Sequence, residues 1–353
     1  MNRGNNYRAW DIEPLKSETA AKKDLYLNLV GWAILAASTH NVQPWRFIVR
    51  LPENIIDISL DKTGILPVSD KTGRQAYISI GCAAENLLLA AEYYGLKPKV
   101  EYFSNSLHPL PTVRFTFSDW KKLEFCDPHF IASIKKRKMS RGKFKPGLTV
   151  PKPVLEKLKK TVKEFNLSSN FITDALTRFF IAQIQYQADR IVVAWNDFRY
   201  ELADYLLPNN TEKTRGMPGN TFGLSDEMAI RIHEELKKKG IFDADLAVGF
   251  AATNRDGIRS APVICVIGVK KDEPEWWIKA GGAFQKSALL AEINGLSVAI
   301  LASIVEVETF NKLMKARLGS GHRPTVIFRM GYPIQEMPHS PRANVEEVTE
   351  VME

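Results

Sequence analysis

The sequence predicts an α+β protein built from two tandem copies of one fold, which together form an intramolecular pseudo-dimer. Segments with helical and strand-like patterns alternate along the chain. In addition, GCAAENLLLAAEYYGL at 81–96 recurs 200 residues later as GGAFQKSALLAEINGL at 281–296, with seven of the 16 positions identical and both bounding glycines kept. Recurrence at a fixed displacement is typical of a duplicated unit.

The first copy, residues 1–127, has the pattern of one complete α+β unit. Residues 20–37 are apolar almost all round, which predicts a largely buried helix. A second helix is expected over 76–95, where alanine and glycine would let another backbone approach closely and Gly95 suits a left-handed cap. Strands are expected at 46–50, 55–60, 99–103 and 111–117.

The second copy, residues 128–353, is longer than the first. Its expected helices cover 133–144, 151–165, 177–195, 281–296 and 305–319, with a strand at 261–269. The segment HRPTVIFR at 322–329 echoes HPLPTVRF at 108–115, so the helix at 305–319 is an addition to the second copy. Residues 207–225 are rich in Pro, Gly, Asn and Thr, which predicts a surface loop; such a loop can act as a lid, although simple mobility is the ordinary interpretation.

Charge and cysteine content limit the classes of function. The formal net charge of the 353-residue chain is +8, but the lysines are interleaved with acids, as in EKLKKTVKEF, which favours solvated helix faces over a nucleic-acid interface. The same charge suits an anionic cofactor or substrate.

The cysteines indicate neither a disulfide nor a metal site. Cys82, Cys126 and Cys265 are isolated, and no metal-binding spacing occurs, so we expect no disulfide, no metal and a reducing compartment. Without an apolar run of about 20 residues or a signal-peptide pattern, the sequence predicts a cytoplasmic protein with no membrane partner.

Two polar segments differ between the copies. Only the first copy has STHNVQPW at 38–45, where Ser38, Asn41 and Gln43 offer hydrogen-bonding groups for the edge of a flat heterocycle. A helix-terminating turn packed on Pro44 and Trp45 is the structural alternative.

The basic segment KKRKMSRGK at 135–143 occurs only in the second copy. Its cations and hydroxyl suit a phosphate, while a solvated basic turn is the alternative. The residues concerned are Arg137, Lys138, Ser140 and Arg141. Across an interface between the copies, the two segments would form a site for a phosphorylated planar cofactor.

Five stretches together resemble the nitroreductase family of FMN proteins, and more narrowly its tandem-repeat branch typified by the mycobacterial Acg proteins. They are AASTHNVQPWRF (36–47), SIGCAAENLLLAAEYYGL (79–96), IKKRKMSRGKF (134–144), AGGAFQKSALLAEINGL (280–296) and PTVIFRMGYP (324–333). The resemblance covers roughly residues 20–350 and implies a nitroreductase-like fold that binds FMN and takes electrons from NAD(P)H.

The resemblance also implies a set of cofactor-binding residues. Ser38, Thr39 and Asn41 would contact the flavin ring, with Gln43 holding the turn. The ribityl phosphate would be held by Arg137, Lys138, Ser140 and Arg141, together with Arg342 and His339. Backbone amides at Ala302 and Ser303 would lie near flavin N5. The family position that usually carries a base near flavin N1 and O2 is Gly142 here, with Arg141 and Lys143 as possible substitutes.

The resemblance implies a flavin oxidoreductase that passes hydride through flavin N5 to nitroaromatic-like or quinone-like acceptors, without a catalytic protein side chain. The alternative is an FMN-sequestering or redox-sensing protein without turnover, in which residues 215–227 lie over the flavin and Phe222 covers the ring. A nucleic-acid-binding protein would contain no flavin. The expected partner is a small-molecule electron acceptor, and the expected assembly is a monomeric pseudo-dimer or a weak homo-oligomer with one flavin per chain.

Overall fold

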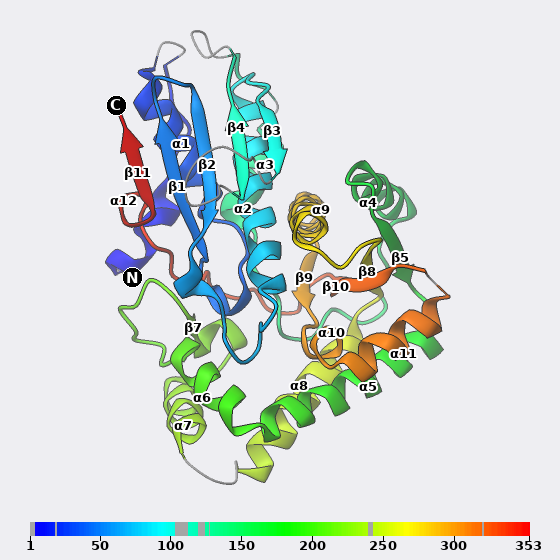
Figure 1. Ribbon diagram of the computed structural model, residues 1–353. Coiled ribbons are helices and arrows are strands. Elements are labelled where there is room, and N and C mark those ends of the chain that lie inside the picture. The colour runs from blue at the N-terminus through cyan, green and yellow to red at the C-terminus, as the bar shows by residue number, and fades with distance from the viewer. Residues whose placement is uncertain are drawn as a thin grey trace.

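Two β-sheets lie on either side of a central pair of helices (Figure 1). The computed structural model describes residues 4–17, 20–102, 112–118, 124–126, 128–238, 243–319 and 321–353. Helices and strands are both present throughout, so the predicted α+β class is confirmed. Within the described residues, no helix has the length and apolar character needed to cross a membrane.

The first sheet has the strand order β11-β1-β2-β4-β3. Its antiparallel neighbours come from the first half of the chain, whereas β11 returns from the C-terminal end and pairs parallel with β1. The strands are β1 (Trp45–Arg50), β2 (Ile55–Leu60), β3 (Lys99–Tyr102), β4 (Val113–Thr116) and β11 (Thr349–Met352). The accompanying helices are η1 (Asn5–Asp11), α1 (Lys22–Ala33), η2 (Thr39–Asn41), η3 (Lys62–Gly64), α2 (Arg74–Tyr93) and α12 (Val345–Val348).

The second sheet is fully antiparallel and has the order β5-β8-β10-β9. All of β8 is buried, because both faces of the sheet are covered. The strands are β5 (Ser168–Ile172), β8 (Val263–Val269), β9 (Ser297–Ile300) and β10 (Arg323–Gly331). The helices next to this sheet are α3 (His129–Lys136), α4 (Lys152–Glu164), α9 (Pro274–Ile293), α10 (Ser303–Glu306) and α11 (Glu308–Leu318).

The two sheets follow the same plan. When α2 is matched with α9, the order β1-β2-β4-β3 corresponds to β5-β8-β10-β9. The second half has two insertions, of which α10 and α11 form one; α11 is the additional helix that the sequence predicted. The other insertion, between β5 and β8, contains α5 (Ala175–Ala194), α6 (Asn196–Tyr205), β6 (Leu206–Leu207), β7 (Met217–Pro218), η4 (Gly219–Phe222), α7 (Asp226–Lys237) and α8 (Ala244–Ser260).

Reciprocal contacts join α2 and α9 at the centre of the molecule. A Cβ atom at Gly81 would lie 2.0 Å from the carbonyl oxygen of Ile278, and one at Gly281 would lie 2.0 Å from the carbonyl oxygen of Ile78. The two contacts are related by the 200-residue displacement of the sequence repeat. Glycine is required at both positions because any side chain would enter the backbone of the other helix.

Several sequence predictions need correction. Helix α1 ends at Ala33 rather than at residue 37. The segment 207–225 is not a plain surface loop, because it contains β7 and η4 and buries Met217 and Thr221 to 5% and 2% exposure. The parallel strand β11 was not predicted. Residues 108–111 of the first HPLPTVRF segment and Asp127 at the proposed boundary lie outside the described residues.

Candidate functional site

A cavity of about 50 Å³ lies where the turn after α1, the basic segment after α3 and the chain before α12 meet. The structure therefore brings the two polar segments of the sequence to one place. Predicted site residues that line the cavity are Ser38, Asn41, Arg137, Lys138, Arg141, His339 and Arg342. Predicted residues that do not line it are Thr39, Gln43, Ser140, Ala302 and Ser303.

The turn after α1 has an unusual backbone. His40, Asn41 and Gln43 all have positive φ angles, at 46°, 57° and 53°. Non-glycine residues adopt this region at a cost, so such a turn persists only where its surroundings hold it. The fully buried Trp45 follows the turn, and the Gln43 side chain donates to the Thr214 carbonyl (2.7 Å) and accepts from the Ala343 amide (3.0 Å).

Asn41 lies at the centre of the polar contacts around the cavity. Its side-chain oxygen accepts from Nη1 of Arg342 at 2.6 Å. Its side-chain nitrogen donates to the carbonyl oxygens of Gly216 and Pro341, both at 2.9 Å. One amide thus joins three segments that are far apart in the sequence.

Three arginines around the cavity have no ion-pair partner within the described residues. Arg137 and Arg342 are each 4% exposed, and each donates to a carbonyl oxygen in the segment after α1, at Leu35 and Ala36. Burial lowers the pKa of Arg137 and lowers the pKa of Arg141 to about 10. Burial also lowers the pKa of Arg342 to about 9, and the positive charge of Arg137 contributes to that shift. Buried cations without carboxylates indicate a site for an anion.

Further donors support an anion site. The Nε atoms of Arg137 and Arg342, two residues that line the cavity, are buried and have no hydrogen-bond partner within the described residues. The Ser140 hydroxyl is also buried without such a partner, although Ser140 does not line the cavity. Lys138, in contrast, forms an ion pair with Glu336 at 3.0 Å.

Residues 207–225, which we call the lid, close one side of the cavity. Arg141 donates to the Thr221 carbonyl oxygen at 3.4 Å, and its Cζ lies 4.1 Å from the centre of the Phe222 ring. Phe222 therefore packs against the arginine. At its other end the lid is held by Asn6, whose side chain donates to the carbonyl oxygens of Thr211 (2.9 Å) and Lys213 (3.2 Å).

The N-terminal segment η1 is a part of the site that sequence reasoning missed. The Trp10 ring stacks on His339 at a centroid distance of 3.9 Å, and its indole donates to the Ser340 carbonyl at 2.9 Å. The Arg342 guanidinium lies 5.0 Å from the same ring. The available signal was a tryptophan in an otherwise polar N-terminal stretch.

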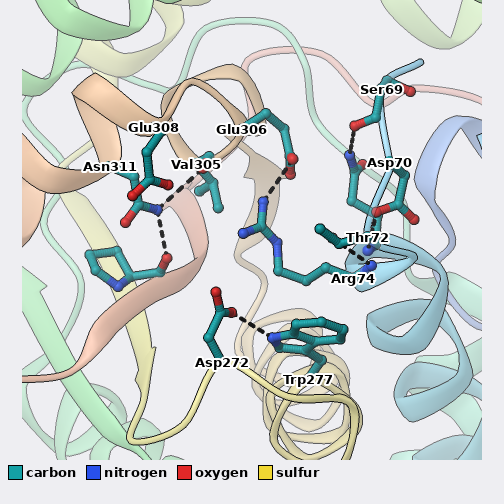
Figure 2. Close-up of polar contacts among 12 residues, drawn as sticks. Ser69, Asp70, Thr72, Arg74, Asp272, Trp277, Val305, Glu306, Glu308 and Asn311 are labelled. Atoms are coloured by element: carbon teal, nitrogen blue, oxygen red, sulfur yellow. Dashed lines mark hydrogen bonds and ion pairs between the residues drawn. The ribbon is translucent and has the colours of Figure 1, made fainter. Parts of the chain in front are cut away.

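Ala302 and Ser303 lie at the start of α10, where polar contacts join three helices. Ser303 donates to the buried carboxylate of Asp189 on α5 at 2.7 Å, and burial raises the pKa of Asp189 to about 6. Figure 2 shows Arg74 reaching from α2 to Glu306 of α10, at 2.7 Å. Helix α10 is thus fixed at its start to α5 and at its end to α2.

The sequence similarity to Acg proteins is confirmed by comparison with known proteins. No family model matches the chain. Over 340 residues the chain is 23% identical to "Putative NAD(P)H nitroreductase acg" from Mycobacterium tuberculosis, in strains CDC 1551 / Oshkosh and H37Rv. The match covers 95% of this chain and 98% of the relative.

Solved structures of shorter proteins show a weaker likeness. They include the FMN-dependent nitroreductase NfnB from Mycobacterium smegmatis in complex with NADPH (15% identity, TM-score 0.42) and the FMN and NADPH-dependent nitroreductase NfnB from sphigopyxis sp. strain HMH (18% identity, TM-score 0.40). The alignments cover 64% and 63% of this chain, and 98% and 97% of those chains.

Proposed function

We propose that this protein is an FMN-binding oxidoreductase that takes hydride from NAD(P)H and reduces nitroaromatic-like or quinone-like acceptors. The observation that carries the proposal is the cluster of three arginines without ion-pair partners beside the Asn41 turn. The cations suit the phosphate of FMN, and the turn offers amide groups for the ring edge. Similarity to Acg over nearly the whole chain supports the same class of activity.

In this proposal the residues divide by the part of FMN that they hold. Arg137, Lys138, Ser140, Arg141 and Arg342 bind the phosphate. Ser38, Thr39, Asn41 and Gln43 bind or support the ring, and the amides at Ala302 and Ser303 lie near N5. FMN supplies the hydride chemistry when it is bound. The protein residues orient it, exclude water and provide positive charge.

The chain's organisation as a tandem duplication is part of this proposal. We assign residues 1–127 and 128–353 to the two copies. Two observations support this assignment: the matching strand orders and the reciprocal contacts of Gly81 and Gly281. Gly81 meets Ile278 and Gly281 meets Ile78, and such a contact made in both directions is characteristic of an isologous interface.

The lid supports a second candidate function, the sequestration of FMN or redox sensing without turnover. The lid occupies hydrogen-bonding groups that the proposal gives to the flavin, namely the Asn41 amide and the Arg141 guanidinium. The cavity of about 50 Å³ is smaller than pockets for small molecules, which usually measure roughly 300–1,000 Å³, so in this second candidate function the lid moves aside before FMN binds. A lid that closes again over the flavin would exclude acceptors.

Purified protein tests both functions. We expect yellow protein with one FMN per chain, and a colourless protein that binds no added FMN would contradict both candidates. Anaerobic mixing with NADPH or NADH should bleach the flavin absorbance in an enzyme. A protein that is reduced by dithionite but not by either nucleotide would support sequestration.

The variant Asn6→Ala tests the lid separately, because Asn6 holds the lid and is not one of the proposed flavin ligands. Loss of two hydrogen bonds should weaken lid closure by about 1–2 kcal/mol. We expect flavin reduction to become several-fold faster if lid opening limits the rate. Asn294→Ala, which removes a side-chain hydrogen bond to the Leu290 carbonyl oxygen at the end of α9, is the control. An unchanged rate in Asn6→Ala would show that the lid does not limit access.

A further inference from the structure

Arg329 is a buried arginine whose contacts lie next to the proposed phosphate site. It occupies the interior of β10, is 1% exposed, and forms no ion pair within the described residues. Its Nη1 donates to the Gly142 carbonyl oxygen and its Nη2 to the Arg141 carbonyl oxygen, both at 2.6 Å. Two short, charge-assisted hydrogen bonds therefore connect β10 with the basic segment.

The absence of a side chain at Gly257 leaves space for the Arg329 guanidinium. A Cβ atom at Gly257 of α8 would lie 2.5 Å from Cζ of Arg329, so even alanine would displace the side chain. The Phe144 ring centre lies 5.2 Å from the same Cζ. Helix α8 thus has its glycine at the point where Arg329 passes.

Backbone hydrogen bonds fix the basic segment on both sides of Arg141 and Gly142. On one side the Ser140 amide donates to the Val298 carbonyl oxygen at 2.9 Å. On the other side the Lys145 amide donates to the Tyr332 carbonyl oxygen at 2.8 Å. Between these points, Arg329 binds the two carbonyl oxygens of a turn that contains a flexible glycine.

The electrostatic arrangement is unfavourable without an anion. Burial lowers the pKa of Arg329 to about 10, and the positive charge of Arg141 contributes to this shift. Uncompensated cations inside a protein reduce its stability, whereas an anion that binds between them removes the repulsion.

We propose that Arg329 is the positioning residue of the phosphate-binding segment: it fixes the Arg141–Gly142 turn so that the Arg141 side chain faces the cavity, and it adds positive charge behind that turn. This inference rests on the proposed function, since it assigns Arg329 to the same site. Arg329 is expected to act on the phosphate of the ligand and to have little effect on the flavin ring.

The test compares Arg329→Gln and Arg329→Lys with the wild type for two ligands, FMN and riboflavin, which differ by the phosphate. Dissociation constants are measured by flavin fluorescence quenching. We expect the FMN dissociation constant of Arg329→Gln to rise roughly 10-fold or more, with an intermediate effect for Arg329→Lys and no change for riboflavin. Arg323→Gln on the same strand, whose partners are Asp272 and Glu308, is the matched control.

Equal weakening of both ligands would overturn the inference, because it would indicate general loss of structure. Unchanged FMN binding would also overturn it. If Arg329→Gln fails to fold, Gly257→Ala replaces it, because the new Cβ displaces the guanidinium and should give the same selective loss of FMN affinity.

Inorganic phosphate separates this inference from the proposed function. If the wild-type protein binds no flavin, the proposed function fails. A phosphate-dependent rise in Tm that is present in the wild type and lost in Arg329→Gln would still support the positioning role. Equal phosphate responses in both proteins, or no response in either, would then overturn it.

Discussion

The two halves of the chain are alike at the central helices and different beside them. Helices α2 and α9 meet through equivalent glycines, with the same backbone contact made in both directions. The connection that leads from a helix into the first strand of each half is different. Residues 34–44 between α1 and β1 form the turn with three positive φ angles, whereas α4 and β5 are joined by residues 165–167, in which only Asn166 has a positive φ.

This comparison indicates which part of the two similar halves can change. The helix pair buries a core shared by both halves, so a change there affects the stability of the whole chain. A connection at the edge of the core can be shortened without such a cost. We therefore expect one functional site per chain, formed by the long turn of the first half and the basic segment of the second.

The largest expected effect is on the helix pair. Gly81→Val and Gly281→Val should each reduce the free energy of unfolding by about 3 kcal/mol or prevent folding, because each side chain would enter a facing backbone. Urea denaturation of both variants measures this. Gly249→Val, at a position where a Cβ meets no atom within 4 Å, is the control. A severe effect at one glycine and none at the other would contradict the equivalence of the two helices.

The second-largest expected effect is on FMN binding at the proposed site, which is formed by the turn of the first half and the basic segment of the second. Asn41→Ala and Arg137→Ala should each weaken FMN binding roughly 10-fold or more, since each removes hydrogen bonds that involve a buried polar group. The double variant should lose less than the sum if both residues hold one ligand. Asn166→Ala in the short connection of the second half should leave FMN affinity unchanged. Normal FMN content in both single variants would show that the assignment of the site is wrong.

A smaller effect is expected at a pair of positions that differs between the helices. Glu85 on α2 has Gln285 as its counterpart on α9. A carboxylate oxygen of Glu85 lies 3.7 Å from Nζ of Lys286. Burial raises the pKa of Glu85 from 4.5 to about 7, with Lys286 opposing the shift and Glu92 and Glu164 adding to it. Between these two pH values the folded protein binds more protons than the unfolded chain, so the free energy of unfolding falls as the pH rises from about 4.5 to 7.

Glu85→Gln should remove this dependence, which amounts to about 1–3 kcal/mol. Thermal unfolding between pH 4.5 and 8 measures it. Glu156→Gln, at an exposed ion pair on α4, is the control. If the pH dependence is the same with and without the Glu85 carboxyl, that carboxyl does not titrate as its burial indicates.

Parts of the fold and site could be predicted because their signals are local. Apolar periodicity located α1, α2, α5 and α9, and turn residues located the cap at Gly95, which has a φ of 75°. The two polar segments were visible because each differs from its counterpart in the other half. Arg329 also left a local signal, a charged residue within the apolar stretch TVIFRMG, but its meaning depends on Gly257 and the carbonyl groups that it reaches.

Contacts between distant segments could not be predicted in the same way. Strand β11 pairs with β1 across about 300 residues, and short strands carry little periodicity. Asn6 and Trp10 have no pattern that connects them with the lid or with Arg342, because those contacts depend on where the folded chain brings the N-terminal segment.

By itself, the sequence determined the α+β class, the repeat at a 200-residue displacement, and the residue types that suit a phosphate and a flat ring. These are properties of local composition and spacing, which are fixed before the chain folds. Only the tertiary structure decided that Asn41, Arg137, Arg141 and Arg342 surround one cavity and that the lid binds two of them. The physical reason is that buried cations and strained turns persist only where contacts from distant segments hold them, and those contacts exist only in the folded chain.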